Sequence, residues 1–159
     1  MKANFMLAIA AVAAMSSAIA EIPKTAAQAT ATIQQRGAAS FLSELTPDEV
    51  DQLYRHFDDG EAEWLPLVPT LAAAADGANA EGLTVSLAFA LAKNPKGVLS
   101  LLTEKDGVLG VGRVCSMPFI EDTAPAGYQR KAVVVVRKVT EPSLRRMRTL
   151  CLQALKQAK

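Results

Sequence analysis

The sequence is short of the side chains that carry out most protein chemistry. Its 159 residues include 1 histidine and 2 cysteines, so neither a zinc site with several histidines nor the zinc-protease motif with two of them can exist. The chain also contains no Gly-x-Ser-x-Gly nucleophile elbow and no phosphate-binding P-loop. We therefore predict no catalytic residue, no metal site and no cofactor, and a protein that is not an enzyme.

Charge of one sign is not in excess either, because 17 basic and 16 acidic side chains give a formal net charge of +1. This near balance argues against a nucleic-acid partner, since general nucleic-acid binders carry a strong basic excess. A content of 50% hydrophobic residues excludes an intrinsically disordered chain, and 2 cysteines are too few for a disulfide-dense miniprotein. The length suits one domain with a core of its own.

No apolar run is long enough to span a bilayer, and the best candidate lies at the start of the chain. Lys2 precedes an uncharged stretch over residues 5–15, which is 11 residues long, whereas a membrane helix needs about 20. Small residues ending at Ala20 complete the layout of a cleaved secretory signal. We predict a signal peptide over 1–20, cleaved after Ala20, and a mature domain over 21–159 that is periplasmic or secreted and not inserted in a membrane.

The cysteine content fits this compartment. An exported chain meets an oxidising environment, so Cys115 and Cys151 are expected to form one disulfide. Two free, buried thiols are the alternative. A metal site would need further ligands, and the single histidine, His56, lies far from both cysteines in the sequence.

Hydrophobic periodicity predicts an all-α fold, a compact array of about six to seven short amphipathic helices. The clearest one starts at Thr46-Pro47-Asp48-Glu49, where an N-cap, a proline and a capping-box Glu coincide. Asn94-Pro95 repeats the cap followed by proline. The expected helices cover residues 26–45, 46–59, 64–75, 79–91, 94–102, 128–139 and 142–155.

Two segments fit a helix or a strand. Residues 107–115 contain three glycines, which weaken both predictions. Residues 132–139 are rich in valine and have strand propensity. A strand would bury one of the adjacent Arg137 and Lys138, whereas a helix places both on the polar face, so a helix is favoured.

The charges are distributed unevenly along the chain. Residues 21–80 carry 3 basic and 10 acidic side chains, a net charge of −7, and residues 81–159 carry 13 basic and 6 acidic side chains, a net charge of +7. One interpretation is that the two halves neutralise each other within the fold. The other is a bipolar surface that steers a charged partner.

The densest acidic cluster follows the helix predicted from Thr46. Its spacing does not match a calcium loop, which alternates its ligands and ends in a bidentate Glu. It is therefore either a solvated turn or a patch that faces a partner, anchored by a tryptophan that is otherwise part of the core. The candidate partner-binding residues are Asp58, Asp59, Glu61, Glu63 and Trp64.

The last predicted helix carries a basic face. The helix dipole explains the two lysines near its C-terminus. An anionic partner, or the acidic first half of the same chain, would explain the arginines. The face consists of Arg145, Arg146, Arg148, Lys156 and Lys159.

A pattern over residues 107–158 carries a family resemblance. It consists of Gly110-Val111 shortly before Cys115, Pro118 soon afterwards, a valine-rich helix, a restart at Pro142, and Cys151 ahead of Ala154-Leu155. This pattern resembles the Rap/Tai-type immunity proteins of type VI secretion. Those proteins lie in the periplasm, contain a disulfide and block a peptidoglycan-cleaving effector by direct binding. The resemblance carries over the two cysteines as a disulfide and no inhibitory residue.

These observations favour an exported small helical protein that acts by protein–protein binding, as an inhibitor or immunity factor against a secreted effector. The alternative is a structural or accessory envelope protein without a dedicated heterologous partner, which associates only with itself. A hydrolase with an acid–base pair among its carboxylates is a distant third.

Overall fold

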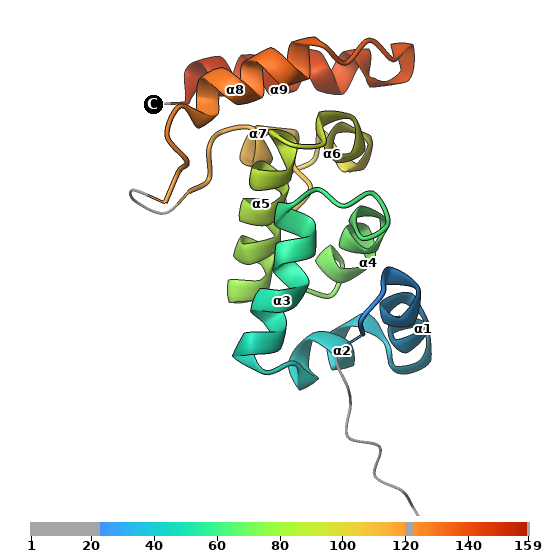
Figure 1. Cartoon of the computed structure of the whole chain (residues 1–159). Coiled ribbons are helices and arrows are strands. Elements are labelled where there is room, and N and C mark those ends of the chain that lie inside the picture. The colour runs from blue at the N-terminus through green and yellow to red at the C-terminus, as the bar shows by residue number, and fades with distance from the viewer. Residues whose placement is uncertain (1–22, 120–122, 159) are drawn as a thin grey trace, which may run out of the picture.

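The computed structural model describes residues 23–119 and 123–158, and this part of the chain is all-α, with nine α-helices, two short 3-10 helices and no strand (Figure 1). The expected signal peptide over 1–20 and its cleavage site lie outside the described residues. In order, the elements are α1 Ala26–Arg36, α2 Ala38–Glu44, α3 Pro47–Asp58, η1 Leu65–Leu67, α4 Val68–Ala72, α5 Gly77–Leu91, α6 Pro95–Leu101, α7 Val111–Val114, α8 Tyr128–Arg137, η2 Pro142–Leu144 and α9 Arg145–Gln157.

The all-α prediction is confirmed, and the number of helices is higher than expected because one predicted helix is broken and a short helix, Val111–Val114, is added. Gly37 has a φ of 85° and separates α1 from α2, so the expectation of one helix over 26–45 is wrong. Glycine adopts this backbone conformation without the steric cost that other residues meet. The chain can therefore turn at Gly37 while Ile33 and Phe41 on either side stay buried.

The ambiguous segment over 107–115 is neither a full helix nor a strand. Residues 107–110 form a loop, and only Val111–Val114 is helical. The loop is held by two backbone hydrogen bonds, from the Thr103 N–H to the Leu109 carbonyl and from the Val111 N–H to the Thr103 carbonyl, each 2.8 Å long. The valine-rich segment is helical, as the periodicity favours.

Local capping signals set the helix starts that the sequence predicts best. The N-cap Thr46 and Glu49 form a capping box, with the Thr46 N–H donating to Glu49 Oε2 at 2.7 Å. These hydrogen bonds lower the pKa of Glu49. Asn94 caps α6 by accepting from the Gly97 N–H at 2.9 Å. Helix α5 starts two residues before the expected cap Asn79, because Asp76 occupies the N-cap position instead.

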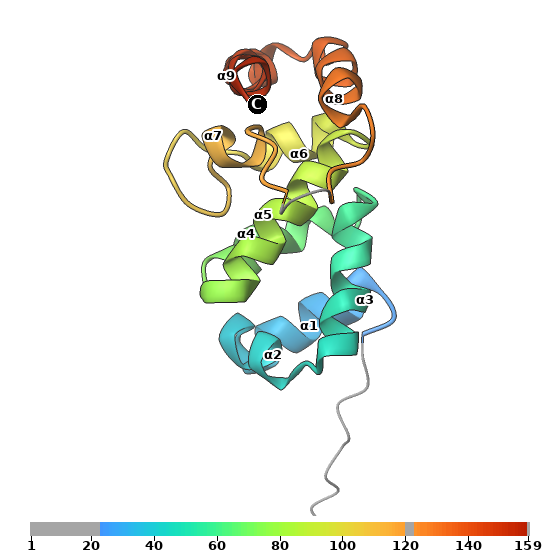
Figure 2. The same cartoon turned by 90° about the vertical axis from the view of Figure 1, so that its left-hand side faces the viewer.

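Helix α5 runs through the middle of the molecule (Figures 1 and 2). Its side chains Leu83, Leu87 and Leu91 are fully buried. The other elements surround it, with α3 alongside, α1 and α2 at one end, and α8 and α9 lying side by side across the other end. Within residues 23–119 and 123–158, no helix has the length and apolar character needed to cross a membrane.

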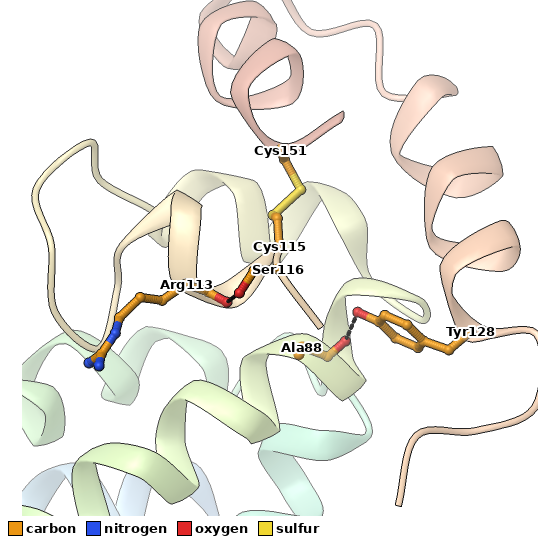
Figure 3. Close-up of a disulfide and its surroundings, with 6 residues drawn as sticks. All are labelled: Ala88, Arg113, Cys115, Ser116, Tyr128 and Cys151. Atoms are coloured by element: carbon orange, nitrogen blue, oxygen red, sulfur yellow. Dashed lines mark hydrogen bonds between the residues drawn. A yellow bond between two sulfur atoms is a disulfide. The ribbon is translucent and has the colours of Figure 1, made fainter. Parts of the chain in front are cut away.

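Two contacts fasten the α8–α9 hairpin to the rest of the fold (Figure 3). The expected disulfide between Cys115 and Cys151 is present, with its Cα atoms 5.2 Å apart, and joins the end of α7 to α9. At the start of α8, the buried Tyr128 hydroxyl donates to the Ala88 carbonyl of α5 at 2.6 Å, and burial raises the pKa of this phenol.

Removing the disulfide is expected to destabilise the protein. The two cysteines are 36 residues apart, and closing a loop of this length stabilises the folded state by about 4 kcal/mol in the chain-entropy model. The variant Cys115→Ala/Cys151→Ala should therefore unfold at a lower urea concentration than the oxidised protein. Reductant should lower the midpoint of the wild type and leave that of the variant unchanged. Equal midpoints for the oxidised wild type and the variant would contradict this prediction.

Candidate functional site

The acidic cluster at the end of α3 and in the turn that follows it pairs half of its carboxylates with basic side chains of the same chain. Lys93 Nζ donates to Asp59 Oδ1 at 2.6 Å, and this hydrogen bond is the main cause of a lowered pKa for Asp59. Glu61 Oε2 lies 2.9 Å from Nδ1 of His56. Glu63 is exposed. Two of the four candidate carboxylates are thus already occupied by basic partners of the same chain.

Trp64 lies in the core and presents almost none of its surface to solvent. Its side chain is 4% exposed, and its indole stacks on the imidazole of His56 with ring centroids 4.0 Å apart and planes at 4°. A small pocket of 250 Å³ opens beside this stack, lined by apolar side chains that include Phe41 and Leu53. This placement agrees with the core interpretation of the tryptophan.

Asp58 is half-buried between α3 and α5. Desolvation by burial raises the pKa of Asp58, and the nearby Ser86 hydroxyl and Lys93 oppose this effect. Its Oδ1 atom is buried and has no hydrogen-bond partner among the described residues. The Oδ1 atom of Asp58 therefore faces the interior of the fold.

The same turn is held against the junction of α5 and α6. Asn94 Nδ2 donates to the Gly60 carbonyl at 2.8 Å. Gly60 has a φ of 66°, and a Cβ atom built on it would lie 2.9 Å from Cβ of Asn94, so only glycine fits there. Taken together, these contacts make the acidic turn a structural junction.

The α8–α9 hairpin, in contrast, carries charge that the described residues do not neutralise. Residues 128–158 contain 8 basic side chains and 1 carboxylate, Glu141. Glu141 pairs with Lys96 of α6, and Arg146 pairs with Glu104. The exposed side chains that form no ion pair with any described residue are Arg130, Lys131, Arg137, Lys138, Arg145 and Lys156.

The two charged halves of the sequence are separated in space. Residues 23–72 contain 3 basic and 8 acidic side chains, and seven of the acidic ones lie on α3 or in the turn after it, whereas the basic helices α8 and α9 lie together across one end of the molecule (Figures 1 and 2). Among the described residues a single ion pair, Lys93 with Asp59, joins the acidic half to the basic half. Direct pairing between the two halves is therefore limited to this one ion pair among the described residues.

The sequence predicted a basic face on the last helix, α9. For α8 it predicted only that Arg137 and Lys138 lie on the polar face of a helix, without a binding role. A usable signal was present, because the run from Tyr128 to Thr140 contains no acidic residue. The sequence does not show that α8 lies beside α9, an arrangement that combines the two basic faces.

The basic hairpin also exposes one apolar side chain. Val134 of α8 is 47% exposed and is the only exposed large hydrophobic side chain in the described part of the chain.

Comparisons with known proteins give no further guidance: no family model, no curated protein and no solved structure matches this chain. Within the described residues, no group of three or more His, Cys, Asp or Glu side chains is placed to hold a metal ion.

Truncating the buried tryptophan should cost stability. Trp64→Ala is expected to lower the free energy of unfolding by about 4 kcal/mol, as for other buried aromatic side chains. Trp64→Phe retains part of the stack on His56 and should lose clearly less. The measurement is urea denaturation followed by circular dichroism. A Trp64→Ala variant as stable as the wild type would show that the indole is not part of the core.

The neighbouring Asp58 and Asp59 should respond to neutralisation with opposite signs. Burial raises the pKa of Asp58 above its ordinary 3.8, so its ionisation destabilises the fold as the pH rises through the folded-state pKa. The pKa of Asp59 is lowered, so its contribution is present at neutral pH and lost on acidification.

Thermal melts at neutral pH and below pH 3.8 test this difference. Relative to the wild type, Asp58→Asn should gain stability at neutral pH and lose that advantage in acid. Asp59→Asn should lose stability at neutral pH only. The same sign for both variants at neutral pH would contradict the assignment.

Proposed function

We propose that this protein is exported and acts by binding another protein, and that the α8–α9 hairpin is its interaction surface. The observation that carries the proposal is the group of six cations on this hairpin that form no ion pair with a described residue. Cations gathered at one end and left without internal counter-charges attract an anionic surface over a distance set by the ionic strength.

The composition of the hairpin suits a protein partner. Protein interfaces combine an apolar centre with a polar rim and are enriched in arginine. On α8, the exposed Val134 lies one turn from Arg130 on one side and from Arg137 and Lys138 on the other. In such an interface Val134 would supply an apolar contact, and the cations around it a charged rim. The acidic turn is a weaker candidate, because two of its carboxylates already pair with basic side chains of this chain and its tryptophan is buried.

Export and the biological role rest on the sequence. The signal-like segment over 1–20 and the disulfide support a periplasmic or secreted protein. The resemblance to Rap/Tai-type immunity proteins supports an inhibitor of a secreted effector as the specific form of binding. The effector would present an acidic surface to the hairpin. The alternative role, a structural envelope protein that associates with itself, uses the same charge separation between two copies.

A capture experiment with the exported protein tests the proposed function. Tagged protein is incubated with envelope and secreted fractions of the host at about 0.05 M and about 0.5 M salt. Long-range electrostatic attraction persists at the lower salt concentration and is screened at the higher one. We expect one stoichiometric partner at low salt that is lost at high salt and degrades cell wall. Self-association without a second protein would instead favour the structural alternative.

A charge-matched pair of variants makes this test specific to the hairpin. Arg137→Gln/Lys138→Gln removes two cations of α8, and Lys105→Gln/Arg113→Gln removes two exposed cations elsewhere. Both variants leave the core unchanged and should melt with the wild type. The first should reduce capture of the partner by about tenfold or more, and the second by less than about threefold, because attraction is strongest at the contact surface. Equal losses would reject the hairpin as the interface.

A further inference from the structure

The packing of α8 against α9 leaves an open groove with a cationic lining. Its volume is 420 Å³. Three of its six lining side chains are basic and none is acidic, and one residue comes from α8 and five from α9. The lining residues are Arg137, Arg148, Thr149, Leu152, Gln153 and Lys156.

One of these cations is held in place by the backbone. Nη1 of the half-buried Arg148 donates to the Val139 carbonyl, just beyond the end of α8, at 2.6 Å. A guanidinium carries five N–H donors in a planar fork, so this hydrogen bond fixes its position and leaves most donors available. Arginine held in this way loses less side-chain entropy when it binds a ligand than a free lysine does.

The other two cations of the groove differ from Arg148 in being exposed. Arg137 and Lys156 are exposed and form no ion pair with a described residue. Between the charges, Leu152 contributes apolar surface to the groove. On α8, the exposed Val134 lies one turn before Arg137. The groove therefore combines an arginine held by a hydrogen bond, two exposed cations and nearby apolar side chains.

We propose that this groove receives the carboxylate side chains of an acidic segment of the partner protein. Arg148 forms the paired hydrogen bonds that a guanidinium makes with a planar carboxylate, and Arg137 and Lys156 neutralise neighbouring carboxylates. Val134 and Leu152 contact an apolar side chain of the same segment. The inference rests on the proposed function and assigns the chemistry by which the hairpin recognises its partner.

The structure favours a protein segment over a lipid surface. Binding in the membrane interface requires a broad apolar helix face beside the cations. Val134 is the only exposed large hydrophobic side chain within the described residues, and a single valine does not provide such a face. A groove with one fixed arginine fits discrete carboxylates better than a plane of headgroups.

The test uses the exported protein with its disulfide intact and defined probes. The main probe is an acetylated and amidated peptide in which every fourth residue is Leu and the others are Glu. Its control carries Gln in place of Glu. Titrations are followed by calorimetry and by the amide shifts of α8 and α9. Vesicles of pure phosphatidylglycerol provide the lipid arm.

We expect the Glu peptide to bind with amide shifts centred on the groove, and the Gln peptide and the vesicles to bind at least about tenfold more weakly. Binding to the vesicles as tight as to the Glu peptide would overturn the proposal in favour of an anionic membrane. Absence of peptide binding at low salt would also overturn it.

Matched variants separate the groove from general electrostatic attraction. Arg137→Gln/Lys156→Gln should weaken binding of the Glu peptide by about tenfold or more. Arg130→Gln/Lys131→Gln removes the same charge from α8 outside the groove and should weaken it by less than about threefold. The swap Arg137→Lys/Lys156→Arg keeps the charge and should retain binding within about threefold. Equal losses for the two neutralised pairs would reject the groove.

Failure of this inference is distinguishable from failure of the proposed function. If the capture experiment yields the salt-sensitive partner and Arg137→Gln/Lys156→Gln retains it, the protein binds a partner but the groove does not receive it. If no partner is captured, the proposed function fails whatever the peptide does.

Discussion

Burial of α5 is the constraint on which the remaining helices depend. Leu83, Leu87 and Leu91 have no exposed surface, so this helix is stable only while other elements cover it on several sides. Helix α3 covers one side so closely that a Cβ atom on Gly82 would meet the Tyr54 ring at 2.3 Å. The acidic turn, the α7 segment and the first turn of α8 are each placed by contacts with α5 or with the turn that follows it.

Repulsion between like charges destabilises the α8–α9 hairpin, and two contacts with the rest of the fold offset this effect. Eight basic side chains on residues 128–158 repel one another, and repulsion between like charges works against a compact arrangement. The disulfide at Cys151 and the Tyr128 hydrogen bond to Ala88 fix α9 and α8 at separate points. Because the disulfide and this hydrogen bond hold both helices, the hairpin can retain like charges whose repulsion would otherwise favour its separation from the rest of the fold.

The sequence predicted best what depends on neighbouring residues. The starts of α3 and α6 follow from the capping residues Thr46 and Asn94, which act within four positions. The helical state of α8 followed from the spacing of Arg137 and Lys138, although its valines favour a strand. The prediction of one helix over 26–45 was wrong because the hydrophobic periodicity continues across Gly37, while the backbone of Gly37 breaks the helix.

The site was predicted less well, because it depends on contacts between distant segments. The density of acidic residues around Asp59 suggested a binding patch, but its partner Lys93 lies 34 positions away. The interior position of Trp64 likewise depends on the way the turn folds back onto His56. The groove between α8 and α9 combines residues that no local pattern relates, since Arg137 and Lys156 meet only after the hairpin closes.

Separation of the charges also gives the molecule a permanent dipole moment, which points from the acidic side chains of α3 and the turn after it toward the α8–α9 end. An electric field exerts a torque on such a dipole, so the molecule turns before it touches an anionic body. For most protein pairs the search for the correct mutual orientation limits association to about 10⁵–10⁷ M⁻¹s⁻¹. A molecule that arrives already aligned shortens this search, and the same torque turns the acidic end away from the approaching surface.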